Sequence, residues 1–339
     1  TTPDPHFLYK VLADMVASGI EYVVMEVSAH ALHFGKTEGI AFEAGIFTNL
    51  TEDHLDFFPT MEAYAAAKEK LFAPGVCRFC VLNTDDAEGR KLAASCREPF
   101  TYALENPADV FAVDIRESFE GSRFVINLFD ELYEIRLRLA GLHNVYNAMA
   151  AAECAKLLGV SVPVIAAGLA ALPRVSGRLE HIARFRGADI FVDFAHTPDG
   201  LEKSLSALRR HCAGRLICVF GCGGNRDTRK RPLMGATAAR LADFTVLTSD
   251  NPRYEDPFDI ILQIEEGVRP QTEDYVIVVD RESAIEYAVD MLQAGDVLLV
   301  AGKGGETYQE IMGVRHIYND IAVVRGAIEC AARRKDRER

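Results

Sequence analysis

The stretch Phe244–Asp256, FTVLTSDNPRYED, joins a buried strand to a cluster of polar side chains. Its apolar run, Phe244–Leu247, predicts a strand, and Asp250 and Arg253 lie in the polar segment that follows. Ligands of open α/β sheets bind beyond the carboxyl ends of the strands. A carboxylate there can hold an ammonium group, and a guanidinium can hold a carboxylate through two parallel hydrogen bonds. The stretch alone is equally compatible with a site for a small zwitterion and with a surface turn that carries a solvated ion pair.

The composition is that of an ordinary globular protein. The chain has 339 residues, 49% of them hydrophobic and 26% charged, and this length suggests two domains. Its formal net charge of -13 argues against general nucleic-acid binding, which requires a basic surface. No apolar run reaches the length of a membrane span, and no signal peptide is recognisable. We therefore expect a cytoplasmic monomer that binds neither nucleic acid nor membrane.

Two features concern the cysteines and the start of the chain. The eight cysteines are scattered, and Cys77 and Cys80 form a single CxxC without a second pair. We expect these thiols to be reduced, in preference to a zinc or redox site. The sequence begins without Met, on TTPDP, which indicates part of a longer protein.

The first half carries acids and a histidine beside predicted strands. Tyr22–Val27 predicts a strand that contains Glu26, and a buried carboxylate is costly unless it is paired or bound to a metal. Ala44–Phe47 predicts a second strand, and the acidic loop after it contains His54. Oxygen ligands with one nitrogen suit a hard divalent ion, so Mg²⁺ or Mn²⁺ is a candidate. A polar connecting loop is the alternative.

Two helices of this half carry further polar side chains. Met61–Phe72 has helical spacing, and Lys68 beside its apolar stripe could simply extend to solvent. Asn144 and Asn147 lie where the strongly helical segment Ala148–Leu158 begins, so helix capping is one interpretation of both asparagines.

The second half alternates strands and helices in a regular way. After a linker at residues 174–178, strands are predicted at residues 190–194, 216–220, 244–247 and 297–301. This alternation predicts a parallel sheet with right-handed crossovers. The loops after these strands contain Asp193 and His196, Asn225 and Arg226, Asp250, Asn251 and Arg253, and Lys303 and Glu306. Because parallel strands end at one edge, we expect these side chains to form one pocket.

The two halves together indicate a ligation. A metal that holds phosphates in the first half and a polar pocket in the second fit activation of a carboxylate by ATP, followed by attack of an amine. The phosphate-binding loop GxxxxGK[ST] does not occur in the sequence. We therefore expect this chain alone to hold ATP phosphates weakly.

A series of motifs carries a family resemblance. In chain order they are MEVSAHAL, FTNLTEDHLDF, MEAYAAAKEKLF, HNVYNA, SGRLE, VDFAHTPDGLEK, VFGCGGNRDTRKRPLMG, TSDNPRYEDP and AGKGGETYQ. They resemble the Mur ligases over essentially the whole chain, and the MurE-type branch in particular. The resemblance implies the rear part of a central ATPase domain, residues 1–175, and a Rossmann-like C-terminal domain with a mostly parallel sheet, residues 176–339. The N-terminal UDP-binding domain and the phosphate-binding loop of that family are not in this sequence.

The resemblance also implies roles for individual residues. The metal ligands and catalytic residues would be Glu26, His54 and Lys68, the last as a carbamate. The ATP-binding residues would be Asn144, Asn147, Arg178, Asp193 and His196. The UDP-linked substrate would contact Thr1, Thr2, Ser28 and Lys36. The incoming amino acid would contact Arg226, Asp250, Asn251, Arg253, Gly302 and Glu306.

The expected reaction is addition of meso-diaminopimelate to UDP-N-acetylmuramoyl-L-alanyl-D-glutamate through an acyl phosphate, with ATP and Mg²⁺. The DNPR form of the opening stretch resembles the diaminopimelate-adding members, and Arg253 would pair with the second carboxylate that lysine lacks. Two positions depart from the family: Gly305 replaces a histidine, and Lys36 replaces an arginine. The alternatives are a lysine-adding or folylpolyglutamate-like ligase, or a non-catalytic remnant that binds an amino acid or a partner. We expect a truncated ligase.

Overall fold

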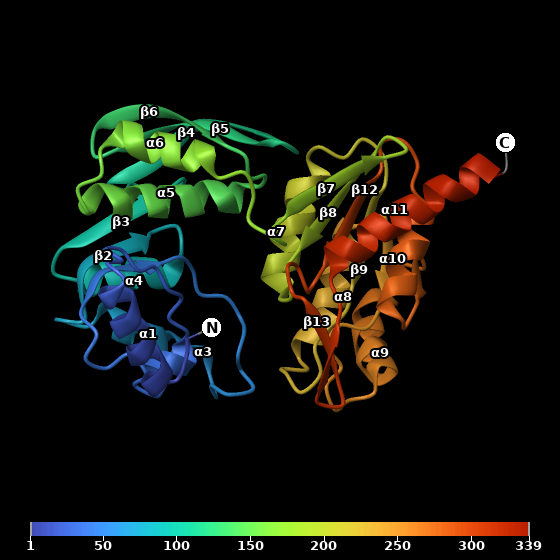
Figure 1. Ribbon diagram of the computed structural model, residues 1–339, viewed down its shortest axis with the longest axis horizontal. Helices are drawn as coiled ribbons and strands as arrows, with labels where there is room; N and C mark the ends of the chain where they lie inside the picture. The colour runs from blue at the N-terminus through green and yellow to red at the C-terminus, as the bar shows by residue number, and fades with distance from the viewer. Residues whose placement is uncertain (1, 338–339) are drawn as a thin grey trace. The chain divides into compact units, whose positions relative to one another are not determined.

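The computed structural model describes residues 2–337, and Figure 1 shows their arrangement. Contacts group the chain into two compact units. The first consists of the residues up to Val113 with Ile126–Tyr133 and Tyr146–Ile165, and the second of Asp114–Val125, Glu134–Val145 and the residues from Ala166 onward. Both large sheets are of the expected α/β kind, which confirms the fold class. The expected domain boundary between residues 175 and 176 stays a prediction.

The first sheet has six strands in the order β1-β2-β3-β4-β5-β6. The elements up to residue 171 are α1 (Pro5–Ala17), α2 (Ala29–His33), β1 (Phe42–Phe47), α3 (Met61–Glu69), the 3-10 turn η1 (Lys70–Phe72), β2 (Cys77–Asn83), α4 (Ala87–Ser95), β3 (Pro99–Ala103), β4 (Val110–Ser118), β5 (Gly121–Leu128), β6 (Glu131–Leu137), α5 (Leu142–Leu157) and α6 (Val162–Ala171). Strands β1 to β4 pair in parallel. Thr60 caps the N-terminus of α3, since its Oγ1 accepts from Ala63 N at 3.2 Å.

Strands β4, β5 and β6 follow one another along the chain and are neighbours in the sheet. Two-residue connections join them, and such short links are possible only between antiparallel strands. The link between β5 and β6 is Phe129–Asp130, whose φ angles of 50° and 66° match a type I′ hairpin turn. Strands β4, β5 and β6 therefore form an antiparallel meander.

The strand predicted over Tyr22–Val27 is wrong. These residues adopt no regular secondary structure. Val24 is 98% exposed, and the segment lines a cavity of about 880 Å³ together with β1, whose only pairing in the sheet is with β2. Apolar, β-branched residues favour a strand only where a neighbouring backbone supplies hydrogen bonds, and here none of the pairings of the sheet includes the segment.

The second sheet has the strand order β11-β10-β9-β12-β8-β7. Its elements are β7 (Glu180–Phe185), β8 (Ala188–Asp193), α7 (Pro198–Arg209), β9 (Leu216–Phe220), α8 (Lys230–Leu241), β10 (Phe244–Leu247), α9 (Pro257–Val268), β11 (Tyr275–Ile277), α10 (Arg281–Asp290), β12 (Val297–Ala301), the hairpin strands β13 (Tyr308–Ile311) and β14 (Val314–Ile317), and α11 (Asp320–Arg337). All pairings of the large sheet are parallel except that of β7 with β8. The mostly parallel sheet is thus confirmed.

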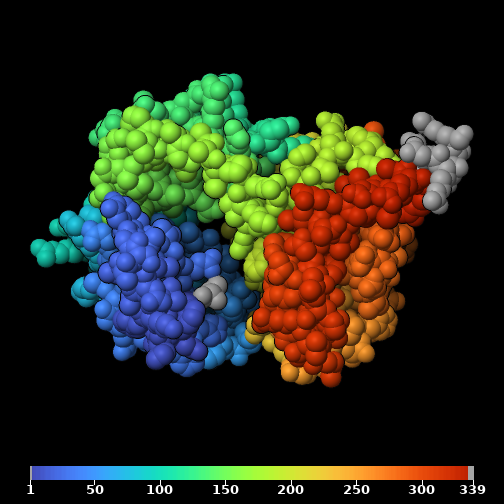
Figure 2. Space-filling model, viewed as in Figure 1, coloured from blue at the N-terminus to red at the C-terminus, as the bar shows by residue number. Residues whose placement is uncertain are grey.

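Alternation along β9 shows how helices cover both faces of this sheet. Leu216, Cys218 and Phe220 belong to one buried cluster, with residues of α7, α8 and α9. Ile217 and Val219 belong to a second cluster, with residues of α10 and α11. Successive side chains of a strand point to opposite faces, so a continuous apolar run is what a strand covered on both faces requires. Figure 2 shows the red C-terminal residues beside the orange residues of α10 on one surface of this unit.

Within residues 2–337, no helix combines the length and the apolar character needed to cross a membrane.

Candidate functional site

Polar loops at the carboxyl ends of β10 and β12 meet in the second unit. Asn251 donates from Nδ2 to Glu306 Oε2 at 3.0 Å and accepts at Oδ1 from Lys303 Nζ at 2.9 Å. Lys303 Nζ also donates to Glu306 Oε2 at 2.9 Å. The structure therefore brings together these two loops, as the parallel topology predicts.

Asp250 and Gly302 lie in contact within this group. Gly302 has a φ of 115°, and a Cβ at this position would lie 2.8 Å from Asp250 Oδ2. Glycine thus allows both the backbone conformation and the close approach of the carboxylate. Asp250 is buried, and its Oδ1 accepts from the Asn251 backbone N at 2.7 Å. Its carboxylate is consequently held at the edge of the β12 loop.

Arg253 and Arg226 approach the same glycine. A Cβ at Gly223, in the loop after β9, would lie 2.9 Å from Arg253 Nη1 and 3.7 Å from Arg226 Cγ. Arg253 donates from Nη1 to Gly224 O at 2.7 Å, and its Nε lies 3.7 Å from Glu310 Oε2. Arg253 is half-buried and Arg226 exposed. The Arg253 guanidinium therefore lies against the β9 loop and near Glu310 of β13, and the side-chain stem of Arg226 lies beside the same glycine.

Arg178 and His196 lie against the ring of Phe194, and Asp193 directly precedes this residue in the chain. The Arg178 guanidinium carbon lies 4.4 Å from the centre of the Phe194 ring, and the His196 ring centre lies 4.8 Å from the same point. Asp193 is buried, and its oxygens accept hydrogen bonds from Leu179 N and Ser204 Oγ. The three predicted residues are neighbours. The Asp193 carboxylate is already used to join the segment at Leu179 to Ser204 of α7.

The segment before Arg178 also packs against the β12 loop. A Cβ at Gly177 would lie 1.9 Å from Gly305 N, and one at Gly305 would lie 3.1 Å from Ser176 O. The absence of a side chain at Gly305 therefore leaves room for close packing of these two backbones. This is the structural setting of the position at which the family motif has a histidine.

Asn144 and Asn147 lie near the start of α5. Asn144 is buried and donates from Nδ2 to Ala140 O at 2.8 Å, while Asn147 is exposed. The first therefore ties the helix to the preceding turn, and the second is an exposed residue of α5.

Lys68 occupies an apolar environment on α3. Its Nζ lies 5.2 Å from the centre of the Tyr64 ring and donates to Asn49 O at 3.4 Å. Burial lowers the pKa of the Lys68 ammonium, and the negative charges of Asp86 and Asp53 oppose this effect. Burial favours the neutral amine, which is the nucleophilic form of lysine.

The predicted contacts for the UDP-linked substrate gather at the N-terminal segment. Thr2 Oγ1 donates to Glu26 O at 2.9 Å and accepts from Ser28 N at 3.0 Å. Ser28 caps α2 by accepting from Ala31 N at 3.2 Å. Lys36 Nζ forms an ion pair with Asp4 Oδ1 at 2.6 Å. Thr2 and Ser28 are therefore in contact, whereas Thr1 lies outside the described residues.

The candidate metal ligands do not form a ready-made site. Glu26 and Lys68 line the cavity beside β1, and the His54 Nε2 atom lies 3.7 Å from Asp53 Oδ2. Among residues 2–337, no group of three or more His, Cys, Asp or Glu side chains could hold a metal ion. Mg²⁺ is commonly held by one or two carboxylates together with substrate phosphates, so a nucleotide-dependent site fits these residues better than a closed protein cage.

Some features of the site have no sequence prediction. Lys303 is fully buried between Asn251 and Glu306; it stands in a polar loop of the sequence, but its burial has no sequence signal. Glu310 reaches Arg253 from β13. Phe194 could have been found from its place between Asp193 and His196.

A buried ion pair fixes the strand ends beneath the site. Arg281 donates from Nε and Nη2 to the two oxygens of Asp320, each at 2.8 Å, and from Nη2 to Ala301 O at 2.8 Å. Its Nη1 donates to Ser249 O at 3.3 Å. Because Ser249 and Ala301 adjoin the β10 and β12 loops, this pair positions both loops.

Comparison with known proteins identifies the family. Residues 1–155 match the Mur ligase middle domain, and residues 177–304 match the Mur ligase glutamate ligase domain. The chain is 44% identical over 312 residues to the UDP-N-acetylmuramoyl-L-alanyl-D-glutamate--2,6-diaminopimelate ligase of Caldanaerobacter subterraneus subsp. tengcongensis, covering 92% of this chain and 64% of that protein. It is 42% identical over 337 residues to the ligase of the same name from Geobacillus kaustophilus, and the match covers 97% of this chain and 69% of that protein. The chain thus spans about two thirds of the length of these relatives.

Solved structures agree with this assignment. A structure of a UDP-N-acetylmuramoyl-L-alanyl-D-glutamate--2,6-diaminopimelate ligase has a TM-score of 0.64 and 36% identity, over 98% of this chain and 69% of that one. A pseudomurein peptide ligase type C from Methanothermus fervidus has a TM-score of 0.69, and the match covers 90% of this chain and 66% of that one. Because its sequence identity is only 19%, this structure supports the fold alone. From the two matching domains and these relatives, the chain belongs to the Mur ligase family.

Proposed function

We propose that the protein forms an amide bond between UDP-N-acetylmuramoyl-L-alanyl-D-glutamate and meso-diaminopimelate at the expense of ATP. The relatives that are 42–44% identical carry this activity in their names. The observation that carries the proposal is the group at the carboxyl edge of the second sheet: Asp250, Asn251, Arg253, Lys303 and Glu306. Its charges and its place at the strand ends suit a small amino acid with more than one carboxylate.

The amino-acid pocket would select diaminopimelate over lysine by charge. Arg253 offers its guanidinium to the second carboxylate of diaminopimelate, and Asp250 offers a carboxylate to an ammonium group. Lys303 is already neutralised by Glu306 at 2.9 Å, so it orders the pocket walls instead of attracting the ligand. Lysine would leave Arg253 without a carboxylate partner, and an unmatched polar group costs more than a matched one gains.

Lys68 would act as a carbamate. Burial lowers the pKa of its ammonium group, which increases the share of neutral amine that can attack CO₂; the new N–C bond forms as one C=O π bond opens, and the nitrogen releases a proton. The product is an anion in place of a cation on the wall that Glu26 shares. Mg²⁺ would be held by Glu26, His54 and this carbamate together with ATP phosphates, and when bound it supplies charge stabilisation for phosphoryl transfer.

The remaining residues would hold the nucleotide and the acceptor substrate. Arg178, His196, Asn144 and Asn147 would contact ATP, and Asp193 would keep the Arg178 segment in place through Leu179. Thr1, Thr2, Ser28 and Lys36 would contact the UDP-linked dipeptide. The γ-carboxylate of that dipeptide would accept the γ-phosphoryl group of ATP, and the amine of diaminopimelate would then displace phosphate from the acyl phosphate.

Binding of the amino acid tests the proposed pocket independently of ATP. Isothermal titration of the chain with meso-diaminopimelate and, separately, with L-lysine compares ligands that differ by one carboxylate. We expect binding of meso-diaminopimelate and at least tenfold weaker binding of lysine, since a charged pair is worth about 1.5–3 kcal/mol. Equal affinity would favour a lysine-adding ligase, and no binding of either would remove the proposed role of this pocket.

The proposed setting is a cytoplasmic enzyme of peptidoglycan precursor synthesis that acts as a monomer. The folylpolyglutamate-like alternative predicts binding of glutamate instead of diaminopimelate. The alternative of a non-catalytic remnant predicts amino-acid binding without any ATP-dependent product, a result that a product assay detects directly.

A further inference from the structure

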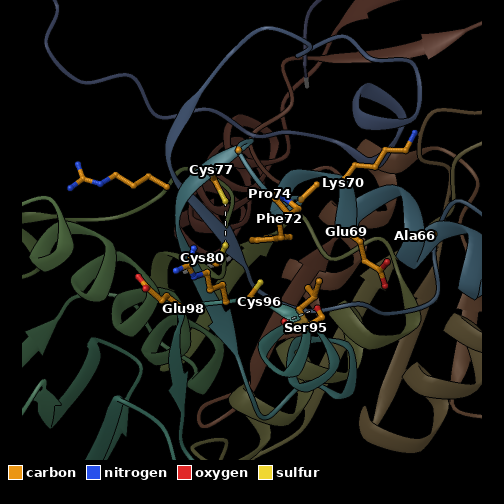
Figure 3. A pocket seen from close by; sticks show the side chains of 15 residues that line it. Ala66, Glu69, Lys70, Phe72, Pro74, Cys77, Cys80, Ser95, Cys96 and Glu98 are labelled. Atoms are coloured by element: carbon orange, nitrogen blue, oxygen red, sulfur yellow. Dashed lines mark hydrogen bonds between the residues drawn. The ribbon is translucent and has the colours of Figure 1, made fainter.

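Three thiols of the first unit meet at one cavity. Cys77 and Cys80 lie on β2, and Cys96 directly follows α4. Their side chains line a cavity of about 850 Å³ together with apolar residues of η1 and α4. Figure 3 shows the sulfur atoms of Cys77 and Cys80 facing each other, with Cys96 beside them. All three residues are half-buried, so their sulfur atoms can be reached from the cavity.

The meeting of Cys77 and Cys80 departs from ordinary strand geometry. Residues three apart in a strand point to opposite faces, yet the two Sγ atoms are 3.4 Å apart. Gly45 of β1 explains this contact. It pairs with Cys80 in the sheet, and a Cβ on it would lie 3.2 Å from Cys77 Sγ. The sulfur of Cys77 therefore lies across the space that the missing side chain of Gly45 leaves open.

The contacts distinguish the three thiols chemically. A hydrogen bond from Cys80 lowers the pKa of Cys77, whereas the same bond is the main cause of a raised pKa of Cys80. Burial raises the pKa of Cys96 to about 11. Cys77 is therefore the thiol of the pair that loses its proton more readily, and once it is a thiolate only Cys80 can donate the hydrogen bond between the two sulfur atoms. By contrast, Cys218 in β9 and Cys222 in the loop after it are buried, and burial raises the pKa of each to about 12.

We propose that Cys77 is a modification site that forms a mixed disulfide with low-molecular-weight disulfides, with Cys80 as its hydrogen-bond donor. The Cys77 thiolate attacks one sulfur of the reagent and forms a new S–S bond. The S–S bond of the reagent breaks, and its other half leaves as a thiolate that takes a proton from water. The cavity provides room for the attached group, and this inference does not depend on the proposed ligase activity.

The β1–β2 pairing makes the mixed disulfide persistent. Cys77 and Cys80 are paired with Phe42 and Gly45, so three residues of extended strand separate their Cα atoms, which is roughly 9 Å at the shortened rise of a twisted strand. A disulfide requires Cα atoms within about 7 Å. Cys80 therefore cannot displace the attached group to form an internal disulfide while β2 stays paired with β1.

The test uses the full chain and oxidised glutathione below stoichiometric amounts near neutral pH, with site mapping by peptide mass spectrometry. Cys330, which is exposed on α11, is the internal reference thiol. We expect the glutathione adduct on Cys77 to form several-fold faster than on Cys330, and to persist without a Cys77–Cys80 disulfide. Adducts that form first on Cys330 or on another cysteine would overturn the assignment.

Two variants test the role of the donor. Cys80→Ala keeps the nucleophile and removes its hydrogen bond, so we expect a several-fold slower reaction at Cys77 with an unchanged rate at Cys330. Cys96→Ala is the matched control in the same cavity and should change the Cys77 rate much less. A Cys80→Ala variant that reacts at Cys77 as fast as the parent would contradict the proposed hydrogen bond.

Discussion

Glu153 provides the sharpest stability prediction. This residue of α5 is fully buried, and neither of its carboxyl oxygens has a hydrogen-bond partner in the structure of residues 2–337. Burial raises the pKa of Glu153 from the ordinary 4.5 to about 8, with a smaller contribution from the charge of Asp109. The folded protein therefore keeps the carboxyl group protonated at a pH where the unfolded chain has lost this proton.

The sign of the pH dependence follows from this difference. Between pH 4.5 and about 8 the folded state binds one proton more than the unfolded state, so the free energy of unfolding falls as pH rises. The free energy of unfolding falls by about 1.4 kcal/mol for each pH unit, which amounts to roughly 4 kcal/mol between pH 5 and pH 8. Glu153→Gln removes this loss, because a neutral amide of nearly the same shape replaces the protonated carboxyl group.

Urea denaturation followed by circular dichroism measures the effect, since the chain contains no Trp. We expect parent and Glu153→Gln to be within about 1 kcal/mol of each other at pH 5. At pH 8 the variant should be more stable by roughly 4 kcal/mol. Glu266→Gln, on the exposed face of α9, is the control and should follow the parent at every pH. If the free energy of unfolding changed with pH in the same way for Glu153→Gln and the parent, the Glu153 carboxyl group would not be buried in its protonated form.

Two further substitutions test the site and its support. Arg253→Lys keeps the positive charge but loses the planar pair of donors, so we expect binding of meso-diaminopimelate to weaken by about 10–100-fold in calorimetry; an unchanged affinity would exclude the guanidinium as a ligand contact. Arg281→Met leaves Asp320 buried without its partner, and we expect a loss of about 3–5 kcal/mol in the free energy of unfolding by urea titration. For that variant, a loss below about 1 kcal/mol would contradict the importance of the pair.

Sequence patterns are sufficient to predict the central strands of the second sheet. The predicted strands at residues 216–220, 244–247 and 297–301 have the same bounds as β9, β10 and β12. Each is a continuous apolar run that ends at a polar or glycine-containing loop, which is the pattern of a strand covered on both faces. The meeting of their loops followed from the parallel topology alone, because all carboxyl ends lie at one edge.

Other features depended on contacts that no local pattern contains. Tyr22–Val27 has strong strand propensity but no pairing partner in the described sheet. The β13–β14 hairpin, which supplies Glu310 to Arg253, was missed although Met312–Gly313 has the positive φ angles of a two-residue turn. The contact of Cys77 with Cys80 contradicts strand alternation, because it depends on Gly45, which lies opposite Cys80 on β1.

The central proposal is that this chain joins meso-diaminopimelate to the UDP-linked dipeptide. The most direct measurement is mass-spectrometric detection of the amide product, with phosphate release, after incubation of the chain with Mg²⁺, UDP-N-acetylmuramoyl-L-alanyl-D-glutamate and either meso-diaminopimelate or L-lysine. ATP is supplied in large excess, because a chain without the phosphate-binding loop is expected to hold ATP phosphates weakly. The account predicts the diaminopimelate product together with phosphate, and little product with lysine. A lysine product of equal or greater yield, or no product from either amino acid, would contradict it.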